Sequence, residues 1–474
     1  MGTDYESGLV VGHWAITTLL LCLSARKASA IRGASANLNV APGSINYSFC
    51  AIYISRYGKM RVMHRPIIRR PALDPYADIP NLKHLQALEA IAATHSITRA
   101  CDHLNLSQPA LTQGIAKVEA QLGVKLFNRR RGMLTTEPGE VYLKRIGRGT
   151  HYLRRAGEYA ARFANRPPPH LHRRFTLSQL RALIAVVEHE SFRLGAQQLA
   201  VQQSTVHRSC RELEAQLDCA LFERTSAGIK PTRQAVEFSR LSKLALGEFA
   251  QARADIQGWK GSFAGRFAIG CLPLAKTSLL PSALMRLTDE YPMLDITVVD
   301  APYADLSKAL RHGDIEIIIG ALRRAQLPPE LVQEELFVDP LIIVGRSGHP
   351  LLSGQSITRR SLAAFPWIAP RAGAPARDYF DSFYAALNRP NEDAHPIETG
   401  SLTVLRGLLM NSDRLTIISA RQVDYEIKLG LLSEVPYPLE GSERSIGITM
   451  REGWMPSVPQ QRLLEHLRTI VAEV

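Results

Sequence analysis

One pattern of residues occurs twice in this chain of 474 residues, at positions about 95 residues apart. The first copy runs from Asn81 to Ile146 and the second from Thr176 to Leu241. Within them, Glu119-Ala120-Gln121-Leu122 returns as Glu214-Ala215-Gln216-Leu217, and Leu126-Phe127 returns as Leu221-Phe222. So many matches in one register indicate a duplicated structural unit. The chain therefore has to fold into two copies of one domain, followed by whatever the remaining residues form.

The first copy has the pattern of a helix-turn-helix. Leu82, Leu85 and Leu88 fall at helical spacing, and Ser96 is placed to cap a second helix. A third helix begins after the cap residue Ser107, and short polar side chains near the start of such a helix can reach base edges in the major groove of DNA. The residues of this helix expected to contact DNA are Ser107, Gln108, Pro109, Thr112, Gln113 and Lys117.

A hairpin is expected directly after this third helix. Leu126–Asn128 and Leu134–Thr135 flank a turn that holds Arg129, Arg130 and Arg131 before Gly132. Arginines on such a wing suit contacts to phosphate or to the minor groove. The alternative is a solvated loop. The position directly after a candidate recognition helix favours the DNA contact.

The second copy keeps the buried frame and changes the surface. Its third helix offers Gln203, Thr205, His207 and Arg208, and its wing offers Arg224. These residues can contact DNA, but the motif around Ser107 is replaced. Two interpretations stay open: the second copy reads a different DNA sequence, or it serves as a structural adaptor. His207 is interpreted as a surface residue rather than a pH switch.

An amphipathic helix is expected after each copy, at residues 141–164 and 235–261. Either helix is an ordinary core helix or a contact between two chains. For the second, the long apolar stripe favours a dimerisation helix. Residues 165–174, with Pro167-Pro168-Pro169, are expected to form a stiff, extended spacer between the copies.

From residue 265 onwards, short apolar runs alternate with helical stretches, which is typical of an open α/β sheet. Residues 265–474 are long enough for two lobes with a cleft between them. The expected strands are 267–270, 295–299, 315–319, 341–344, 366–369 and 415–418, and the expected helices are 279–290 and 306–311.

Several motifs resemble the LysR family of transcriptional regulators, over nearly all of residues 81–470. Ser107–Thr112, Leu122–Phe127 and Thr136–Gly139 resemble its winged helix-turn-helix. The effector domain of the family is resembled at Ile269-Gly270, Leu280-Pro281, Tyr291-Pro292, Gly313-Asp314 and Gly348-His349-Pro350.

The resemblance implies a multidomain fold: two α-helical winged helix-turn-helix domains (81–140 and 175–234), then an α/β two-lobed effector domain like the periplasmic binding proteins of type 2. It also implies a homo-oligomer, a dimer or a tetramer. The segments Asp300–Tyr303 and Gly320–Arg323 look closest to the branch of galactose-binding-protein and aromatic-acid regulators. Glu316 stands where the family usually has an aspartate.

Ligands of open α/β sheets bind beyond the carboxyl ends of the strands, near helix N-termini. A small carboxylate, an aromatic acid or a sugar would suit the backbone N–H groups, hydroxyls and arginine found there. For each hydroxyl taken singly, the alternative is a helix cap. The expected effector-binding residues are Leu272, Pro273, Thr277, Ser278, Gly320, Ala321, Arg371, Ser401 and Thr403.

The net charge and the sequence motifs limit the classes of function that are expected. The net charge of +13 favours double-stranded DNA as a partner, although a merely basic surface is the alternative. The six cysteines form no zinc-type spacing and suit a reducing cytoplasm, so no metal and no cofactor are expected. No GxSxG, Walker or HExxH motif is present, so no catalytic residue is assigned and an enzyme is not expected.

Residues 1–59 are expected to be a non-native or disordered extension, with the natural start at Met60 or Met63. The apolar stretch Gly8–Ser24 follows Asp4 and Glu6 instead of a positive region, which argues against a signal peptide. A membrane-tethered regulator is a less favoured alternative. The sequence thus predicts a cytoplasmic, effector-controlled transcriptional regulator. A solute-binding or transport protein is the alternative from another class.

Overall fold

The computed structural model describes residues 51–54, 60–63, 76, 78–104, 106–163, 170–226, 228–323, 327–354, 356–388 and 395–473, with the backbone alone at 51–54, 60–63 and Arg131. The chain divides into two compact units, Met1–Leu73 and Asp74–Val474. In the first unit, β1 (Ala51–Ile54) pairs antiparallel with β2 (Met60–Met63). The stretch Gly8–Ser24 lies outside the described residues, so the interpretation of the N-terminal extension stays a prediction.

The first copy of the repeat opens the second unit, and side-chain caps fix where its helices begin. Asn81 caps the first helix, the hydroxyl of Ser107 accepts the N–H of Ala110 (3.4 Å), and Thr136 caps the last helix. The structure confirms the three helices and the hairpin that the sequence predicts. The elements are α2 (Leu82–Thr94), α3 (Ile97–Leu104), α4 (Gln108–Leu122), β3 (Phe127–Asn128), η2 (Arg129–Arg131), β4 (Leu134–Thr135) and α5 (Glu137–Ala161).

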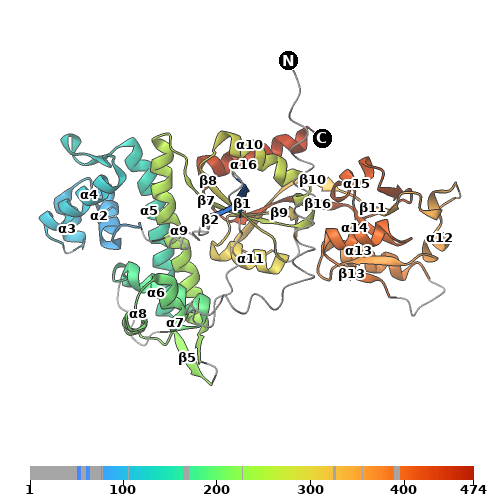
Figure 1. Ribbon diagram of the computed structural model, residues 1–474. Helices are drawn as coiled ribbons and strands as arrows, with labels where there is room; N and C mark the ends of the chain where they lie inside the picture. Colours follow the sequence, from blue (N-terminus) through green and yellow to red (C-terminus); the bar gives the residue numbers. More distant parts are fainter. Residues whose placement is uncertain are drawn as a thin grey trace, which may run out of the picture. The chain divides into compact units, whose positions relative to one another are not determined.

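The second copy repeats this order (Figure 1). Thr176 and Gln179 form a reciprocal capping box at the first helix, and Thr232 caps the last. The elements are η3 (Leu171–Arg173), α6 (Leu177–His189), α7 (Phe192–Leu199), α8 (Gln203–Leu217), β5 (Phe222–Thr225), β6 (Gly228–Pro231) and α9 (Arg233–Trp259).

The segment between the copies differs from the extended spacer that the sequence predicts. Residues 164–169 lie outside the described residues, but Leu171–Arg173 form a turn of 3-10 helix. Leu171 is buried, and it lies beside Gly157 of α5. The extended prediction is therefore wrong for 171–173. The prolines favour an extended chain, but burial of the apolar Leu171 side chain packs this segment against α5.

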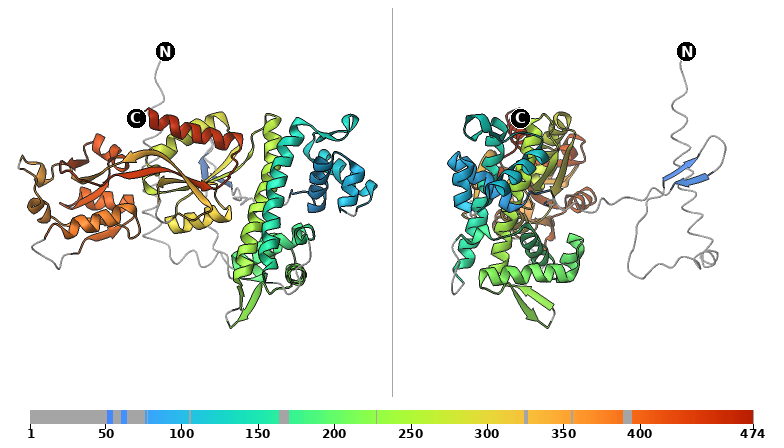
Figure 2. Two further views of the ribbon diagram at one scale, coloured as in Figure 1. Left: turned by 180° about the vertical axis from the view of Figure 1, so that it is seen from behind. Right: turned by 90° about the vertical axis from the view of Figure 1, so that its left-hand side faces the viewer.

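The two long helices α5 and α9 pack along each other, as two views of the ribbon show (Figures 1 and 2). Arg145 Nε of α5 bonds Asp255 Oδ2 of α9 at 2.8 Å, and the ring of Phe249 lies over Gly149. The later residue of α5, Gly149, contacts the earlier residue of α9, Phe249, so the two helices run antiparallel. One hydrophobic core thereby extends through both copies, and a smaller cluster around Val186 and Val206 lies within the second copy.

The apolar stripe of α9 is covered within the same chain. Leu241, Phe249 and Ile256 are buried in the core shared with α5, whereas Trp259 at the end of the stripe is 46% exposed. The sequence pattern shows that this face is buried, but a pattern cannot name the surface that covers it. A role for α9 in pairing two chains stays a prediction.

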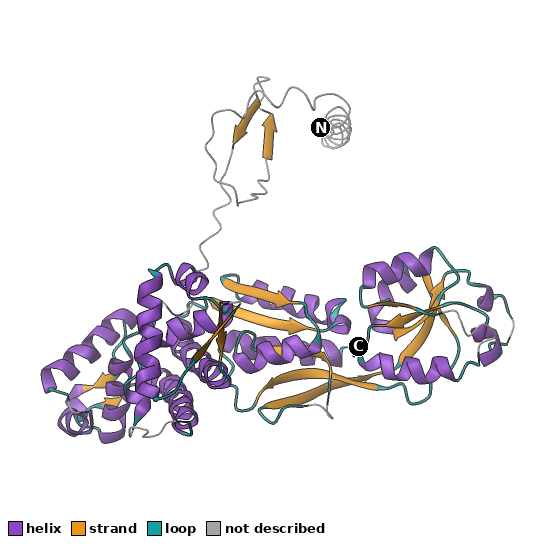
Figure 3. Cartoon of the chain, turned by 90° about the horizontal axis from the view of Figure 1, so that it is seen from below, coloured by secondary structure: helices purple, strands orange, loops and turns teal. Residues whose placement is uncertain are grey.

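The remaining residues form two lobes, each built on a five-stranded sheet (Figure 3). The first sheet has the order β10-β16-β9-β7-β8, with β7 parallel to β8 and β9 and antiparallel pairing at β16 and β10. Its elements are β7 (Gly265–Cys271), η4 (Pro273–Lys276), α10 (Leu279–Glu290), β8 (Leu294–Val299), α11 (Tyr303–His312), β9 (Ile317–Ala321), β10 (Leu331–Asp339), β16 (Arg444–Arg451) and α16 (Val458–Ala472).

The second sheet has the order β13-β12-β14-β11-β15. The chain enters this lobe after β10 and returns to the first lobe at β16, so two crossings join the lobes. The elements are β11 (Leu341–Arg346), η6 (Pro350–Leu352), α12 (Arg359–Ala363), β12 (Trp367–Pro370), α13 (Pro375–Ala385), β13 (Ile397–Thr399), α14 (Leu402–Met410), β14 (Leu415–Ser419), η7 (Ala420–Gln422), α15 (Asp424–Lys428) and β15 (Leu432–Val435).

Both faces of each sheet are covered, which explains the continuous apolar runs in the sequence. In β7, Ile269 belongs to the core formed with α10 and α16, while its neighbour Ala268 belongs to the core formed with α11. In the second lobe, Trp367 packs in the core with α13, while Ile368 packs in the core with α14. This architecture confirms the two-lobed α/β fold that the sequence predicts.

Candidate functional site

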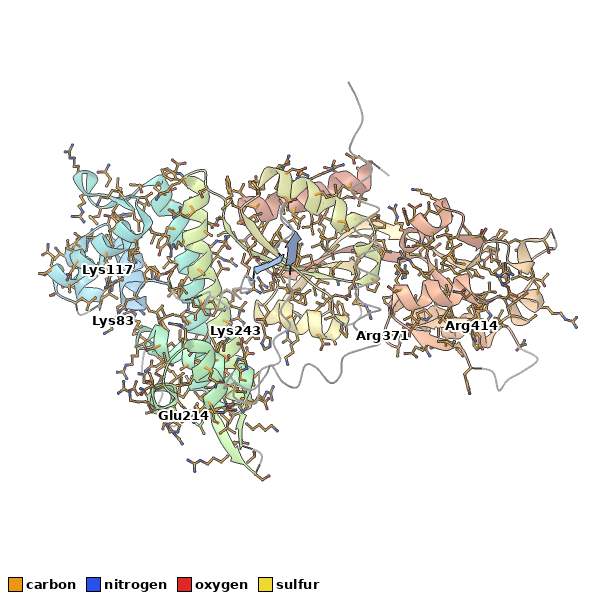
Figure 4. The ribbon with its side chains drawn as sticks, viewed as in Figure 1. Lys83, Lys117, Glu214, Lys243, Arg371 and Arg414 are labelled. Atoms are coloured by element: carbon orange, nitrogen blue, oxygen red, sulfur yellow. The ribbon has the colours of Figure 1, made fainter. Side chains whose placement is uncertain are left out.

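Helix α4 presents a polar face to solvent from a buried frame. Leu111, Ile115 and Val118 are buried, which fixes the rotation of the helix. Among the residues expected to contact DNA, Thr112 is half-buried, and Ser107, Gln108, Pro109, Gln113 and Lys117 are exposed. Figure 4 labels Lys117 on this helix. The start of α4 is thus free for an external partner.

The hairpin brings its arginines next to this helix. Arg129 shares a hollow of about 500 Å³ with Gln108, Pro109, Thr112, Gln113 and Ala116. The amide oxygen of Asn128 accepts the N–H of Arg130 at 3.2 Å, and Gly132 turns the chain with φ +75°. Arg129 and Arg130 are exposed, while the side chain of Arg131 lies outside the described atoms.

An equivalent glutamate joins the hairpin to the third helix in each copy. Glu119 is 3% exposed, and its carboxylate accepts the N–H of Leu126 (2.9 Å) and the ammonium of Lys125 (2.8 Å). The equivalent Glu214 accepts the N–H of Leu221 at 2.8 Å. The repeated Glu-Ala-Gln-Leu segment therefore has a structural meaning that the sequence analysis missed, although the repetition itself was the signal.

Helix α8 presents an equivalent face with different chemistry. Gln203, Thr205, His207 and Arg208 are all exposed, as expected. Position 212 carries a glutamate where the first copy has Lys117, and Arg208 Nε lies 3.5 Å from Glu212 Oε1.

Other features of this copy also differ. Gln202 stands at the start of α8 without a side-chain cap bond, and the ring of His207 lies 5.0 Å from that of Phe192. Arg224 is exposed on β5, next to Glu223, which pairs in register with Lys230 of β6.

Four of the expected effector residues follow β7. Leu272 and Pro273 open η4, Thr277 ends it, and Ser278 stands before α10. Ser278 makes no side-chain cap bond, so its hydroxyl has no role as a helix cap. The hydroxyl of Thr277 lies 3.0 Å from the carbonyl of Arg421 in the second lobe, so this residue joins the two lobes.

Gly320 and Ala321 end β9 beside this segment. A Cβ at Gly320 would lie 2.4 Å from Cβ of Leu272, and the φ of Gly320 is +149°. No residue with a side chain fits this approach without a shift. The ends of β7 and β9 are thus brought together, as the topology argument predicts.

The other expected residues lie in the second lobe. Arg371 follows β12, and its side chain packs beside Gly400. Ser401 caps α14 by accepting the N–H of Val404 (3.4 Å), so for this hydroxyl the simpler alternative holds. Thr403 is exposed on the first turn of α14.

The sequence analysis missed Arg323 and Arg421 as candidate site residues. Arg323 donates to the carbonyl of Gly373 across the lobes (2.9 Å), and its guanidinium lies 4.9 Å from the ring of Tyr303. Burial lowers the pKa of Arg323. Arg421 stacks over Phe337 at 4.5 Å. The signal for Arg323 was its place two residues after β9, where the rule applied to Gly320 also holds.

A contact network joins the second copy, α9 and the first lobe. Lys243 of α9, 8% exposed at its side chain, bonds Glu188 of α6 at 2.6 Å and also bonds Asp314 after α11. Burial and Lys243 together lower the pKa of the neighbouring His312 to about 4. A proton on His312 is therefore disfavoured at this joint.

Three further observations concern metal binding, cysteine chemistry and membrane crossing. Within the described residues, no group of three or more histidine, cysteine or acidic side chains is placed to hold a metal ion. Burial raises the pKa of Cys210 and of Cys271 to about 12, which keeps both as thiols. Among the described residues, no helix combines the length and the apolar character needed to cross a membrane.

Comparison with known families gives matches along the described unit. Residues 82–140 and 177–236 each match the family described as bacterial regulatory helix-turn-helix protein, lysR family. Residues 260–472 match the family described as LysR substrate binding domain.

Individual proteins are also similar. The HTH-type transcriptional regulator GalR of Pseudomonas putida is 32% identical over 399 residues, which cover 84% of this chain and 98% of that protein. PcaQ of Agrobacterium fabrum is 27% identical over 303 residues, 64% of this chain and 96% of that protein. A full-length OxyR variant from Pseudomonas aeruginosa shares 20% identity, with a TM-score of 0.47, over 63% of this chain and 94% of that chain.

The lengths of these alignments differ in an informative way. A span of 84% of this chain has to include both helix-turn-helix matches, so the GalR alignment contains the duplication. The PcaQ alignment, at 303 residues, is too short to hold both copies together with the whole substrate-binding match.

Proposed function

This chain belongs to the LysR family of DNA-binding transcriptional regulators, and from that premise we propose how its residues divide the work. Residues 81–140 are the main DNA-reading domain, and 175–234 are a second one of altered specificity. Residues 265–474 are the effector domain. The helix-turn-helix pair favours this function over a solute-binding or transport role.

DNA contact by the first copy is carried by one observation: α4 and the hairpin converge. Gln108 and Gln113 share a hollow with Arg129, so a duplex seated on α4 would also meet the wing. Glutamine can pair bidentately with adenine in the major groove, while arginine neutralises phosphate. Ser107, Pro109, Thr112, Lys117, Arg130 and Arg131 complete the proposed contact set.

Effector binding is proposed between the lobes, at the ends of β7 and β9 on one side and of β12 and β13 on the other. The hydroxyl of Ser278, the guanidinium of Arg371 and the first turn of α14 supply polar groups there. A small carboxylate, an aromatic acid or a sugar suits them. Thr277 and Arg323 bond across the lobes, so a ligand that displaces these bonds changes how the lobes meet.

The proposal includes a cytoplasmic homo-oligomer, a dimer or a tetramer, that performs no catalysis. Its effector changes the equilibrium between states of the effector domain, and α9 connects that domain to the DNA-reading units. The Lys243 contacts to Glu188 and Asp314 support this route.

The test is DNA binding by the full chain across a salt series. Replacing Arg129 and Arg130 by alanine removes two phosphate contacts for each bound chain, so the slope of log K against log salt falls in magnitude by about 2 per chain in the complex. Arg360→Ala, at an exposed arginine of the effector domain, is the matched control and keeps the wild-type slope. An unchanged slope in the double variant would contradict the proposed role of the wing.

A further inference from the structure

The two DNA-reading units of one chain are related by an approximate twofold axis. Their last helices begin at equivalent caps, Thr136 and Thr232, which are 96 residues apart. At that offset, Gly149 of α5 is equivalent to Ala245 of α9, and Leu153 is equivalent to Phe249. The antiparallel pair sets Gly149 against the ring of Phe249. One turn further along each helix, the same register requires Leu153 to face Ala245.

When each residue is replaced by its equivalent in the other copy, the pair Gly149–Phe249 becomes the pair Ala245–Leu153, so the two helices keep the same register. Leu153 and Ala245 are 2% and 0% exposed, as expected of facing positions in a helix pair. Self-exchange of this kind is the mark of a twofold interface, which normally joins two identical chains. Here both halves belong to one polypeptide.

The interface is built to hold a fixed geometry. Arg145, 2% exposed, bonds both Asp255 (2.8 Å) and Glu248 (3.0 Å) of α9, and Arg148 adds a second contact to Glu248. A buried cation with two carboxylates resists displacement, because losing one partner leaves a charge uncompensated. The helix pair therefore holds α4 and α8 in a constant relation to each other.

The exposed faces of α4 and α8 are equivalent in position but different in chemistry. Gln108 and Gln113 correspond to Gln203 and Arg208, and all four are exposed. Lys117 corresponds to Glu212. The buried side of α8 consists of Val206, Ser209, Cys210, Leu213 and Leu217, and the face with Gln203 and Arg208 is open to solvent, as is the equivalent face of α4.

We propose that one chain reads two different DNA segments in inverted orientation, with α4 on one and α8 on the other. A twofold pair of recognition helices matches the local dyad of a duplex, and two unlike helices require two unlike half-sites. This inference rests on the proposed DNA binding of the first copy. A complex of two chains would repeat the composite site as a unit.

The experiment is selection of binding sequences from a random duplex library by the purified full chain, compared across two matched variants. Gln108→Ala with Gln113→Ala alters α4, and Gln203→Ala with Arg208→Ala makes the equivalent change in α8. Thermal midpoints within about 1 °C of wild type, measured beforehand, show that these exposed substitutions leave the fold intact.

The expected wild-type motif has two inverted and non-identical halves. Each variant should lose information in one half only, a different half for each, with about tenfold weaker binding to the wild-type motif. A perfect palindrome, or a motif that the α8 variant leaves unchanged, would overturn the inference while DNA binding by α4 stands. Failure of the wild type to enrich any motif would overturn the proposed function itself.

Discussion

At the scale of single residues, Glu119 stabilises the junction between the recognition helix and the hairpin. It is buried, and it satisfies the N–H of Leu126 where helix α4 gives way to the hairpin. Removing a buried acceptor leaves its donor unsatisfied, at a loss of about 1–3 kcal/mol. Glu119→Ala should therefore lower the thermal midpoint and weaken DNA binding together, because the wing loses its attachment.

Calorimetry and DNA titration check this prediction. Glu119→Gln keeps an oxygen acceptor and should recover most of the stability. Glu140→Ala removes an exposed glutamate of α5 and serves as the control. Wild-type stability in Glu119→Ala would contradict the assigned role.

His312 makes stability depend on pH. Its pKa is lowered to about 4, chiefly by burial and then by Lys243, whereas the unfolded chain takes up this proton near pH 6.5. The unfolded state thus binds more protons between these values, so stability is lost as the pH falls from 6.5 towards 4. Because His312 is only partly buried, the effect is about 1 kcal/mol.

The measurement is the thermal midpoint at pH 7.5 and pH 5.0. His312→Gln cannot titrate and should show a smaller decrease on acidification than the wild type. His189→Gln, at an exposed position of α6, should follow the wild type. Equal decreases in the wild type and in His312→Gln would show that His312 is free to take up a proton in the folded chain.

At the scale of elements, substitutions at two glycines of α5 distinguish the effect of helix propensity from the effect of packing against α9. A Cβ at Gly149 would lie 2.2 Å from the ring of Phe249, whereas a Cβ at Gly147 meets nothing nearer than 3.8 Å. Glycine to alanine within a helix normally stabilises it by about 0.5–1 kcal/mol. Gly147→Ala should raise the thermal midpoint, and Gly149→Ala should lower it because α9 has to move away. A higher midpoint in both variants would mean that α5 and α9 do not pack as described.

The helices and strands also show how much of the fold could be predicted from the sequence. Caps and apolar spacing predicted α2, α3, α4 and most strands of the two sheets, because these signals are local. The strands β10, β13, β15 and β16 were missed. In β10, Gln333, Glu334 and Glu335 interrupt the apolar pattern, and the strand pairs with β16 from more than 100 residues away. Long-range pairing of this kind leaves little trace in a local window.

The candidate sites divide in the same way. The exposed face of α4 follows from its buried frame, so those residues could be named in advance. Arg421 has no such local signal, because it meets Phe337 across the lobes. Arg323 was missed although it stands two residues after β9, where the rule applied to Gly320 also holds. The sequence showed that α9 has an apolar face, but only the three-dimensional pairing shows that α5 of the same chain covers it.

At the scale of the whole molecule, the duplication and the pairing of α5 with α9 explain each other. Two copies in one chain are always present at equal concentration, and joining them within the chain removes the entropic penalty of bringing two molecules together. Their surfaces are then free to diverge, as Lys117 and Glu212 have done. A regulator built in this way can recognise an asymmetric site.

The most direct test is complementation between chains. One chain carries Gln108→Ala with Gln113→Ala, the other carries Gln203→Ala with Arg208→Ala, and the two are produced in one cell and purified together. Binding is measured on the motif selected by the wild type. If α5 and α9 pair within each chain, every pair of reading units contains one defect, and the mixture binds no better than the mean of the two variants. If the helices instead pair between chains, about a quarter of the pairs of reading units carry no defect and bind like the wild type, and this result would contradict the pairing of α5 with α9 within one chain.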